Sequence, residues 1–146
     1  ITFDGPVTSI GDQAFSGCSS LTSITIPNSV TWIGVWAFSG CSSLTFITIP
    51  NSVTWIGVRA FGDCKSLTSV TIPNSVTGVG GSIFYNCSSL KNIVLSENIT
   101  SLPTSWTYTY LRVGIGFFEG CSSLTSVIIP KILRQSGIEH FMDVKT

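Results

Sequence analysis

Residues 18–40 read CSSLTSITIPNSVTWIGVWAFSG, and this stretch decides the fold because it recurs along the chain. Residues 41–63 read CSSLTFITIPNSVTWIGVRAFGD, and residues 64–86 read CKSLTSVTIPNSVTGVGGSIFYN. A fourth copy begins at Cys87, a fifth begins at Cys121, and a partial copy precedes the first. Self-similarity at a fixed short period is typical of a solenoid, in which each repeat forms one coil.

Each copy follows the apolar pattern C-x-x-L-x-x-I-x-I-P-x-x-V-x-x-I-G-x-x-A-F. The part L-x-x-I-x-I predicts a short strand with alternating faces, which Pro27 ends because proline cannot donate to a ladder. Val30 and Ile33 mark a second extended piece, Gly34 allows a tight corner, and the spacing of Ala37, Phe38 and Cys41 predicts one turn of α- or 3₁₀-helix. No single repeat can bury its own apolar face. Stacked coils must therefore share one core of leucine, isoleucine and phenylalanine ladders.

These repeats resemble the BspA-like leucine-rich repeats, the 23-residue type that is also named after treponemal proteins. The resemblance covers roughly residues 7–130 and rests on Leu, Ile, Ile-Pro, Val, Ile-Gly, Ala-Phe and Cys at the family's positions. It implies an α/β leucine-rich-repeat solenoid that is rich in β-structure. The implied solenoid is a right-handed coil stack with a parallel sheet on the concave face. Short strands and 3₁₀ or helical turns would lie on the other side. The resemblance also implies surface display or secretion, and adhesion or binding of a protein ligand.

The 146 residues are enough chain for one domain. We expect a solenoid over residues 1–130, with an insertion at about 103–113, because the last cysteine spacing is longer than the other three. Residues 131–146 leave the repeat and would form a cap or tail, since a terminal coil needs cover for its open apolar end. The N-terminal stretch ITFDGP resembles neither a signal peptide nor a native start. We therefore interpret the chain as a fragment or the ordered part of a longer protein.

Charge and the length of the apolar runs argue against two classes of partner. Charged residues make up 10% of the chain and the formal net charge is zero, whereas about 25% is usual. Arg59 is the first lysine or arginine, so there is no basic stripe for nucleic acid. No apolar run approaches the ~20 residues that a membrane-spanning helix needs.

The five cysteines occupy the same position in successive coils. Stacking brings such positions to within about 5 Å, but parallel side-chain vectors disfavour the ~90° torsion of a disulfide. We therefore expect a ladder of buried free thiols that act as small apolar side chains and donate weak hydrogen bonds to backbone. Neither a metal site nor a cofactor is expected, because there is no C-x-x-C pair and His140 is the only histidine.

Two outward-facing columns of the second extended piece carry unusual side chains. They read Ser9, Trp32, Trp55, Gly78 and Gln13, Trp36, Arg59, Ser82. We expect Trp32 to stack on Trp55, and Arg59 to make a cation–π contact with Trp36. Tryptophan and arginine are enriched in binding hot spots, and an exposed apolar patch indicates an interface. The alternative is that these rings pack on each other or on a neighbouring domain.

Two further aromatic features could contribute to the same surface. Phe46 interrupts a row of small polar residues on the outer side of the first strand. In the insertion, Trp106, Tyr108 and Tyr110 alternate with threonine, which is a strand pattern. Insertions in solenoids often extend from the binding face, so we expect this one to enlarge the aromatic patch. The alternative is a hairpin that covers exposed core.

The sequence thus favours a non-enzymatic module, because the spacing brings no set of titratable groups together for catalysis. We interpret it as a repeat module for protein or glycan recognition, with a role in adhesion or cell-surface display. The alternative is a structural spacer or assembly subunit whose aromatic face docks on a neighbouring domain or chain. The candidate partner-binding residues are Trp32, Trp36, Trp55, Arg59, Phe46, Trp106, Tyr108 and Tyr110.

Overall fold

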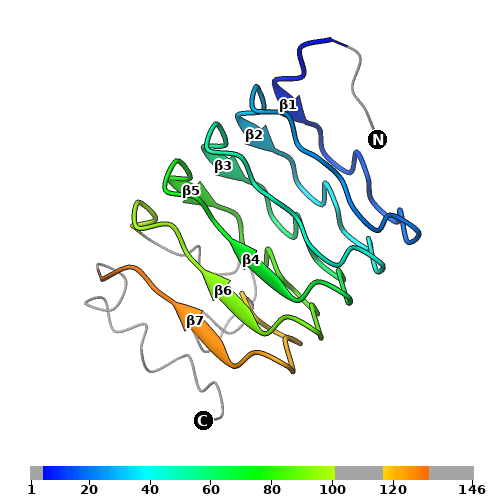
Figure 1. Ribbon diagram of the computed structural model, residues 1–146, viewed down its shortest axis with the longest axis vertical. Helices are drawn as coiled ribbons and strands as arrows, with labels where there is room; N and C mark the ends of the chain where they lie inside the picture. Colours follow the sequence, from blue (N-terminus) through cyan, green and yellow to red (C-terminus); the bar gives the residue numbers. More distant parts are fainter. Residues whose placement is uncertain (1–4, 101–116, 132–146) are drawn as a thin grey trace, which may run out of the picture.

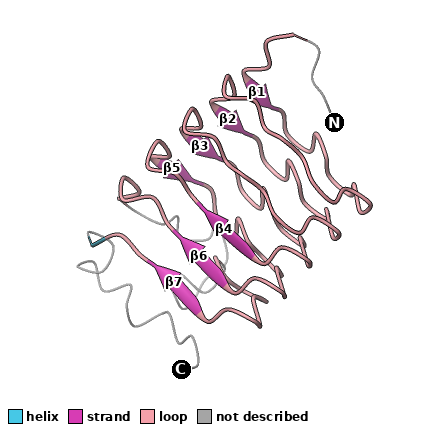
Figure 2. Ribbon diagram, in the orientation of Figure 1, coloured by secondary structure: helices cyan, strands magenta, loops and turns pink. Residues whose placement is uncertain are grey.

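The computed structural model of this chain describes residues 5–100 and 117–131. They form a stack of coils, each lying directly beside the next (Figure 1). One parallel sheet contains, in this order, β1 (Ser9–Ile10), β2 (Trp32–Ile33), β3 (Trp55–Ile56) and β5 (Gly78–Val79). A second parallel sheet contains β4 (Ser69–Thr71), β6 (Asn92–Val94) and β7 (Ser126–Ile128). Almost all of the remaining described chain consists of loops and turns (Figure 2). The predicted parallel β-solenoid is confirmed.

Adjacent coils pair in register, one repeat apart. Trp32 of β2 lies opposite Trp55 of β3, and Ile33 lies opposite Ile56. The backbone N–H of Gly57 donates to the carbonyl of Ile33 at 2.8 Å, which continues the ladder beyond the strand ends. Because the register is one full repeat, every apolar position of a coil meets the same position of its neighbour.

The helical turn expected over residues 37–41 is wrong, because overlapping β-turns occupy the segment of residues 35–40. Its backbone N–H groups alternate between two kinds of acceptor. The N–H of Ser39 donates within the coil to the carbonyl of Trp36 at 3.1 Å, whereas the N–H of Phe38 donates to Ala60 of the next coil at 2.8 Å. Trp36 has a φ of +53°. A left-handed residue interrupts the run of right-handed conformations that a helix needs, and it directs alternate N–H groups toward the next coil.

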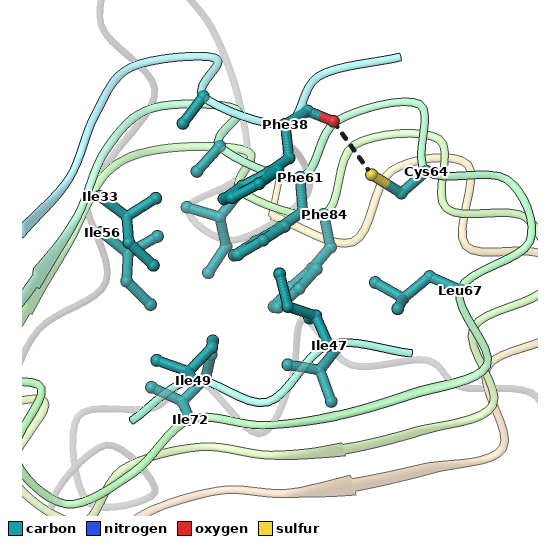
Figure 3. Close-up of a cluster of buried hydrophobic side chains, with 14 of the residues drawn as sticks. Ile33, Phe38, Ile47, Ile49, Ile56, Phe61, Cys64, Leu67, Ile72 and Phe84 are labelled. Carbon is teal, nitrogen blue, oxygen red and sulfur yellow. Dashed lines mark hydrogen bonds between the residues drawn. The ribbon is translucent and has the colours of Figure 1, made fainter. Parts of the chain in front are cut away.

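The core consists of side-chain ladders that run along the stack. The rings of Phe15, Phe38, Phe61 and Phe84 stack in succession, with centroids 5.1, 5.5 and 5.8 Å apart. Ladders of buried isoleucine and leucine lie beside the rings (Figure 3). Burying one such side chain contributes about 1.5–3 kcal/mol. Shared ladders therefore supply the stability that no single coil could provide.

The stack continues on the far side of residues 101–116, which lie outside the described part and include the predicted insertion at 103–113. The N–H of Asn86 donates to the carbonyl of Glu119 at 2.6 Å, and β7 pairs in register with β6. The aromatic ladder changes at this junction. Phe117 meets Phe84 edge-on, with centroids 6.4 Å apart and an interplanar angle of 75°. The coils therefore resume their register, but the parallel ring stack ends at Phe84.

Candidate partner-binding face

The first sheet directs two tryptophans outward. In β2 and β3, Ile33 and Ile56 point into the core and are fully buried. Because successive side chains of a strand point to opposite faces, the preceding Trp32 and Trp55 point away from the core. Trp55 is 43% exposed, and Trp32 is half-buried. The sheet therefore holds the two indoles outside the core at fixed positions.

Trp55 packs along the stack, toward the next coil. Its register partner on that side is Gly78 of β5. A Cβ atom at Gly78 would collide with Cζ3 and Cε3 of the Trp55 indole. Trp32 lies opposite Trp55 in register on the other side. The expected ring stack between them is wrong, because the two indoles make no ring contact although their strands pair. Because residue 78 is glycine, there is room for the Trp55 ring. The sequence analysis did not assign this role to Gly78.

The second column lies in the turn that follows the sheet, and its members adopt left-handed backbone conformations. The φ values are +53° at Trp36 and +48° at Arg59. Large side chains are disfavoured there by roughly 1–2 kcal/mol. At the second left-handed position of these turns the chain uses Gly17, Gly40, Asp63, Asn86 and Gly120. Trp36 nevertheless occupies its position with 42% of its surface exposed. Local backbone preference does not account for a tryptophan here.

Arg59 makes the cation–π contact that was expected of it, but with a different ring. Its guanidinium lies over Tyr85 of the next coil, 4.1 Å from the ring centroid. The predicted partner, Trp36, lies in the preceding coil. Sequence reasoning missed Tyr85, although a signal was available: the equivalent residues in earlier coils are the small Ser39 and Gly62. A large residue that replaces small ones at one repeat position marks a local contact.

The candidate face also includes Val58, which is 38% exposed and accepts a hydrogen bond from the N–H of Trp36 at 2.9 Å. The name tryptophan face is used below for one set of residues: Trp32, Trp36, Trp55, Val58 and Arg59. Phe46 is 57% exposed but lies outside the first sheet, two residues before Thr48, which bridges to the preceding coil. The structure therefore does not place Phe46 in the tryptophan face.

Three of the predicted binding residues fall in the insertion. Trp106, Tyr108 and Tyr110 lie outside the described residues. In the part that is described, His, Cys, Asp and Glu side chains form no group of three that could hold a metal ion. Within those same ranges, no helix combines the length and apolarity that crossing a membrane would require.

The cysteines form the predicted ladder. The thiol of Cys64 donates to the carbonyl of Phe38 in the preceding coil at 3.2 Å (Figure 3), and Cys87 repeats this contact with Phe61 at 3.1 Å. Burial, with a smaller contribution from neighbouring Cys18, raises the pKa of the Cys41 thiol to about 11. Cys18 itself is exposed, because it lies in the first described coil, so the expectation of burial is wrong for this one thiol. The four buried thiols are structural groups that stay protonated at neutral pH.

Comparison with known proteins agrees with this architecture. A family model described as a BspA type leucine-rich repeat region, with six copies, matches residues 1–111 and 105–146. A leucine-rich cell surface protein from Faecalibacterium prausnitzii A2-165 is similar in structure, with 28% sequence identity and a TM-score of 0.74. That match covers 86% of this chain and 30% of the other protein.

Two further solved structures are similar. The leucine-rich repeat protein of T. pallidum is 30% identical, with a TM-score of 0.62, and the match covers 88% of this chain and 67% of that protein. The pneumococcal vaccine antigen PcpA is 25% identical, with a TM-score of 0.61, and the match covers 82% of this chain and 26% of that protein. Curated protein sequences gave no match. From its repeats, its coil stack and the family model that spans it, this chain belongs to the BspA-type leucine-rich repeat family.

Proposed function

We propose that this chain is a non-catalytic repeat module that binds a protein partner through the tryptophan face. One observation carries the proposal. Trp36 and Trp55 expose 42% and 43% of their surface, although the coil stack does not require either ring. The first coil has Gln13 and Ser9 at the same two positions and pairs normally with its neighbour.

Tryptophan side chains suit recognition for a physical reason. They offer a large, rigid contact area and lose little conformational entropy when a partner covers them. Truncating a tryptophan that acts as a binding hot spot costs about 2 kcal/mol or more of binding free energy, about thirtyfold in affinity. The left-handed conformation itself recurs at Gln13 and Ser82 and so belongs to the coil, but a large ring that occupies it at Trp36 needs a reason outside the fold.

We propose a location at the cell surface and a role in adhesion. Two of the similar structures support this proposal, because one is described as a cell surface protein and the other as a vaccine antigen. We include Trp106, Tyr108 and Tyr110 in the proposed contact surface, on the strength of their alternating aromatic pattern. Contacts by the insertion would add to those of the tryptophan face.

The experiment selects binders from a phage-displayed random-peptide library on immobilised wild-type protein. The selected peptides are then measured against the double variant Trp36→Gln, Trp55→Ser, whose new residues are those of the first coil. The matched control is Phe46→Ser, which removes an exposed ring elsewhere and installs the residue of the neighbouring coils at that position. Light scattering during size-exclusion chromatography reports the oligomeric state of each variant.

The proposal expects the double variant to lose peptide binding at least tenfold, and the Phe46→Ser control to keep it. Equal binding by wild type and double variant would remove the tryptophan face as the site. A wild-type oligomer that the double variant splits into monomers would show that the face serves assembly. If no peptide is selected and the protein binds instead to carbohydrates on a glycan array, the partner would be a carbohydrate rather than a protein.

A further inference from the structure

Arg59 is a cation with no acidic partner among the residues that the structure describes. Among residues 5–100 and 117–131, its guanidinium makes no ion pair or hydrogen bond, and its contact is with the Tyr85 ring. Glu119, which has the repeat position of Tyr85 in the following coil, makes no ion pair with Arg59. Two other acidic side chains of the described stack are engaged elsewhere. Asp63 accepts a hydrogen bond from the Asn86 side chain at 2.6 Å, and Asp12 accepts one from the N–H of Val35 at 2.7 Å.

The contact with Tyr85 fixes the guanidinium but leaves its donors free. An arginine stacked on an aromatic ring uses the face of its guanidinium, whereas its five N–H donors lie in the plane and form a fork. Arg59 is half-buried, so its stem is held by neighbouring residues. A donor group that is already oriented loses less entropy when it binds an acceptor. Arg59 is therefore prepared for a planar anion.

Covering the tryptophan face would remove water from Arg59. An unpaired charge in a dry interface is far more costly than an unpaired neutral group, so a partner that covers this face must supply an acceptor. A carboxylate matches the guanidinium fork in shape and charge, and such charge-assisted hydrogen bonds are about twice as strong as neutral ones.

We propose that Arg59 binds an aspartate or glutamate side chain of the protein partner, with an apolar partner residue alongside on Trp55 and Val58. This inference rests on the proposed function, because it specifies the chemistry recognised at the same face. Tyr85 is a positioning residue, since it acts by holding the guanidinium. Trp36 and Trp55 supply contact area, and Arg59 selects partners that carry a carboxylate.

The experiment measures the affinity of selected library peptides by calorimetry. Each acidic peptide is paired with a matched amide peptide in which Asp is replaced by Asn and Glu by Gln. Each peptide is titrated into wild type, Arg59→Gln and Arg59→Lys. Glutamine suits this backbone position, because Gln13 occupies the same repeat position with a similar φ of +56°. Tyr85→Phe and Tyr85→Ser form a second pair, which keeps or removes the aromatic ring.

The expected result is enrichment of acidic residues in the selected peptides, and a tenfold or greater loss when either the carboxylate or Arg59 is removed. Removing both the peptide carboxylate and Arg59 should lower the affinity no more than removing either one, because the two groups contact each other directly. Arg59→Lys should retain only part of the affinity, since an ammonium lacks the planar fork. Tyr85→Phe should bind as wild type, whereas Tyr85→Ser should bind several-fold more weakly.

The two proposals fail in different ways. Peptides that need Trp36 and Trp55 but show no acidic preference and tolerate Arg59→Gln would overturn the role of Arg59, and the tryptophan face would stand. The role of Arg59 would also be overturned if the losses in binding free energy on removing the peptide carboxylate and on removing Arg59 were additive, because the two groups would then not be in contact. A selection that yields no peptide dependent on the tryptophan face would overturn both proposals.

Discussion

The indole of Trp55 lies over the backbone of Gly78, its register partner in the next coil. This relationship joins the fold to the candidate surface. The same β-pairing that stacks Ile56 on Val79 in the core brings a glycine beneath the exposed ring. A side chain at position 78 would compete with the ring for that space. The orientation of Trp55 is therefore set by the neighbouring coil as well as by its own strand.

Gly78→Ala should change the position of Trp55 more than it changes stability. The new Cβ meets the far edge of a side chain that can rotate, so we expect the free energy of unfolding to change by less than about 1 kcal/mol. The displaced ring should alter the tryptophan fluorescence spectrum and weaken binding of selected peptides. Gly81→Ala is the control, because a Cβ there meets nothing within 4 Å. A fluorescence spectrum identical to wild type for Gly78→Ala would contradict the described packing.

Gly57→Ala should destabilise the stack strongly. A Cβ at Gly57 would lie 2.6 Å from the backbone carbon of Gly34 and the backbone nitrogen of Val35. Backbone atoms of a neighbouring coil cannot move aside as a side chain can, so we expect a loss of about 2–3 kcal/mol in urea unfolding. Gly11→Ala is the matched control at the same repeat position, where nothing lies within 4 Å. Comparable losses for both variants would contradict the close approach of the coils.

Trp36→Asn should stabilise the protein while it weakens partner binding. Asparagine tolerates the left-handed conformation that Trp36 adopts at φ +53°, so the substitution should relieve about 1 kcal/mol of strain. Thermal unfolding measures the gain, and peptide titration measures the loss of affinity. Ser82→Asn changes the same position of a later coil and should gain stability without losing affinity. A destabilised Trp36→Asn variant would indicate that the indole is part of the core.

The thiol ladder predicts two classes of cysteine reactivity. Cys18 is exposed and should react rapidly with a thiol reagent, whereas the four buried cysteines should react only when the chain unfolds. Rapid reaction of a second cysteine in the folded protein would contradict the ladder.

Stability should fall in alkaline solution because of the same ladder. The ordinary pKa is 9.0, and burial raises the pKa of Cys41 and Cys121 to about 11. Between these values the unfolded chain releases protons that the folded chain retains. The free energy of unfolding therefore loses about 1.4 kcal/mol per thiol for each pH unit, whereas below pH 9 the thiols have no effect. Urea unfolding across this range measures the slope, and Cys64→Ala should reduce it.

The sequence predicted the parts of the fold that every coil repeats. The in-register stack, the phenylalanine ladder and the thiol contacts all follow from residues that recur at one spacing, because stacked equivalents must meet. The helical turn was predicted wrongly for a reason that is not visible in apolar spacing. Trp36 and Arg59 adopt left-handed conformations, and nothing about these residue types indicates a positive φ.

The candidate face was predictable in its residues but less so in its contacts. Outward-facing tryptophans at repeat positions filled by small residues elsewhere indicated Trp32 and Trp55. The position of each ring depends on the next coil, so the roles of Gly78 and Tyr85 required the structure. Both residues depart from the repeat. Gly78 has no side chain where the Trp55 ring lies, and Tyr85 supplies the ring beneath Arg59. Comparing each coil with its neighbours, position by position, is the way to find such contacts in a repeat sequence.

The most direct test of the central claim, that the tryptophan face is exposed in the free protein and covered by the partner, is oxidative footprinting read by mass spectrometry. The protein is labelled alone and in complex with a selected peptide. We predict rapid oxidation of Trp36 and Trp55 in the free protein, strong protection of both in the complex, and unchanged oxidation of Phe46. Slow oxidation of the two indoles in the free protein, or protection of Phe46 in their place, would contradict the account.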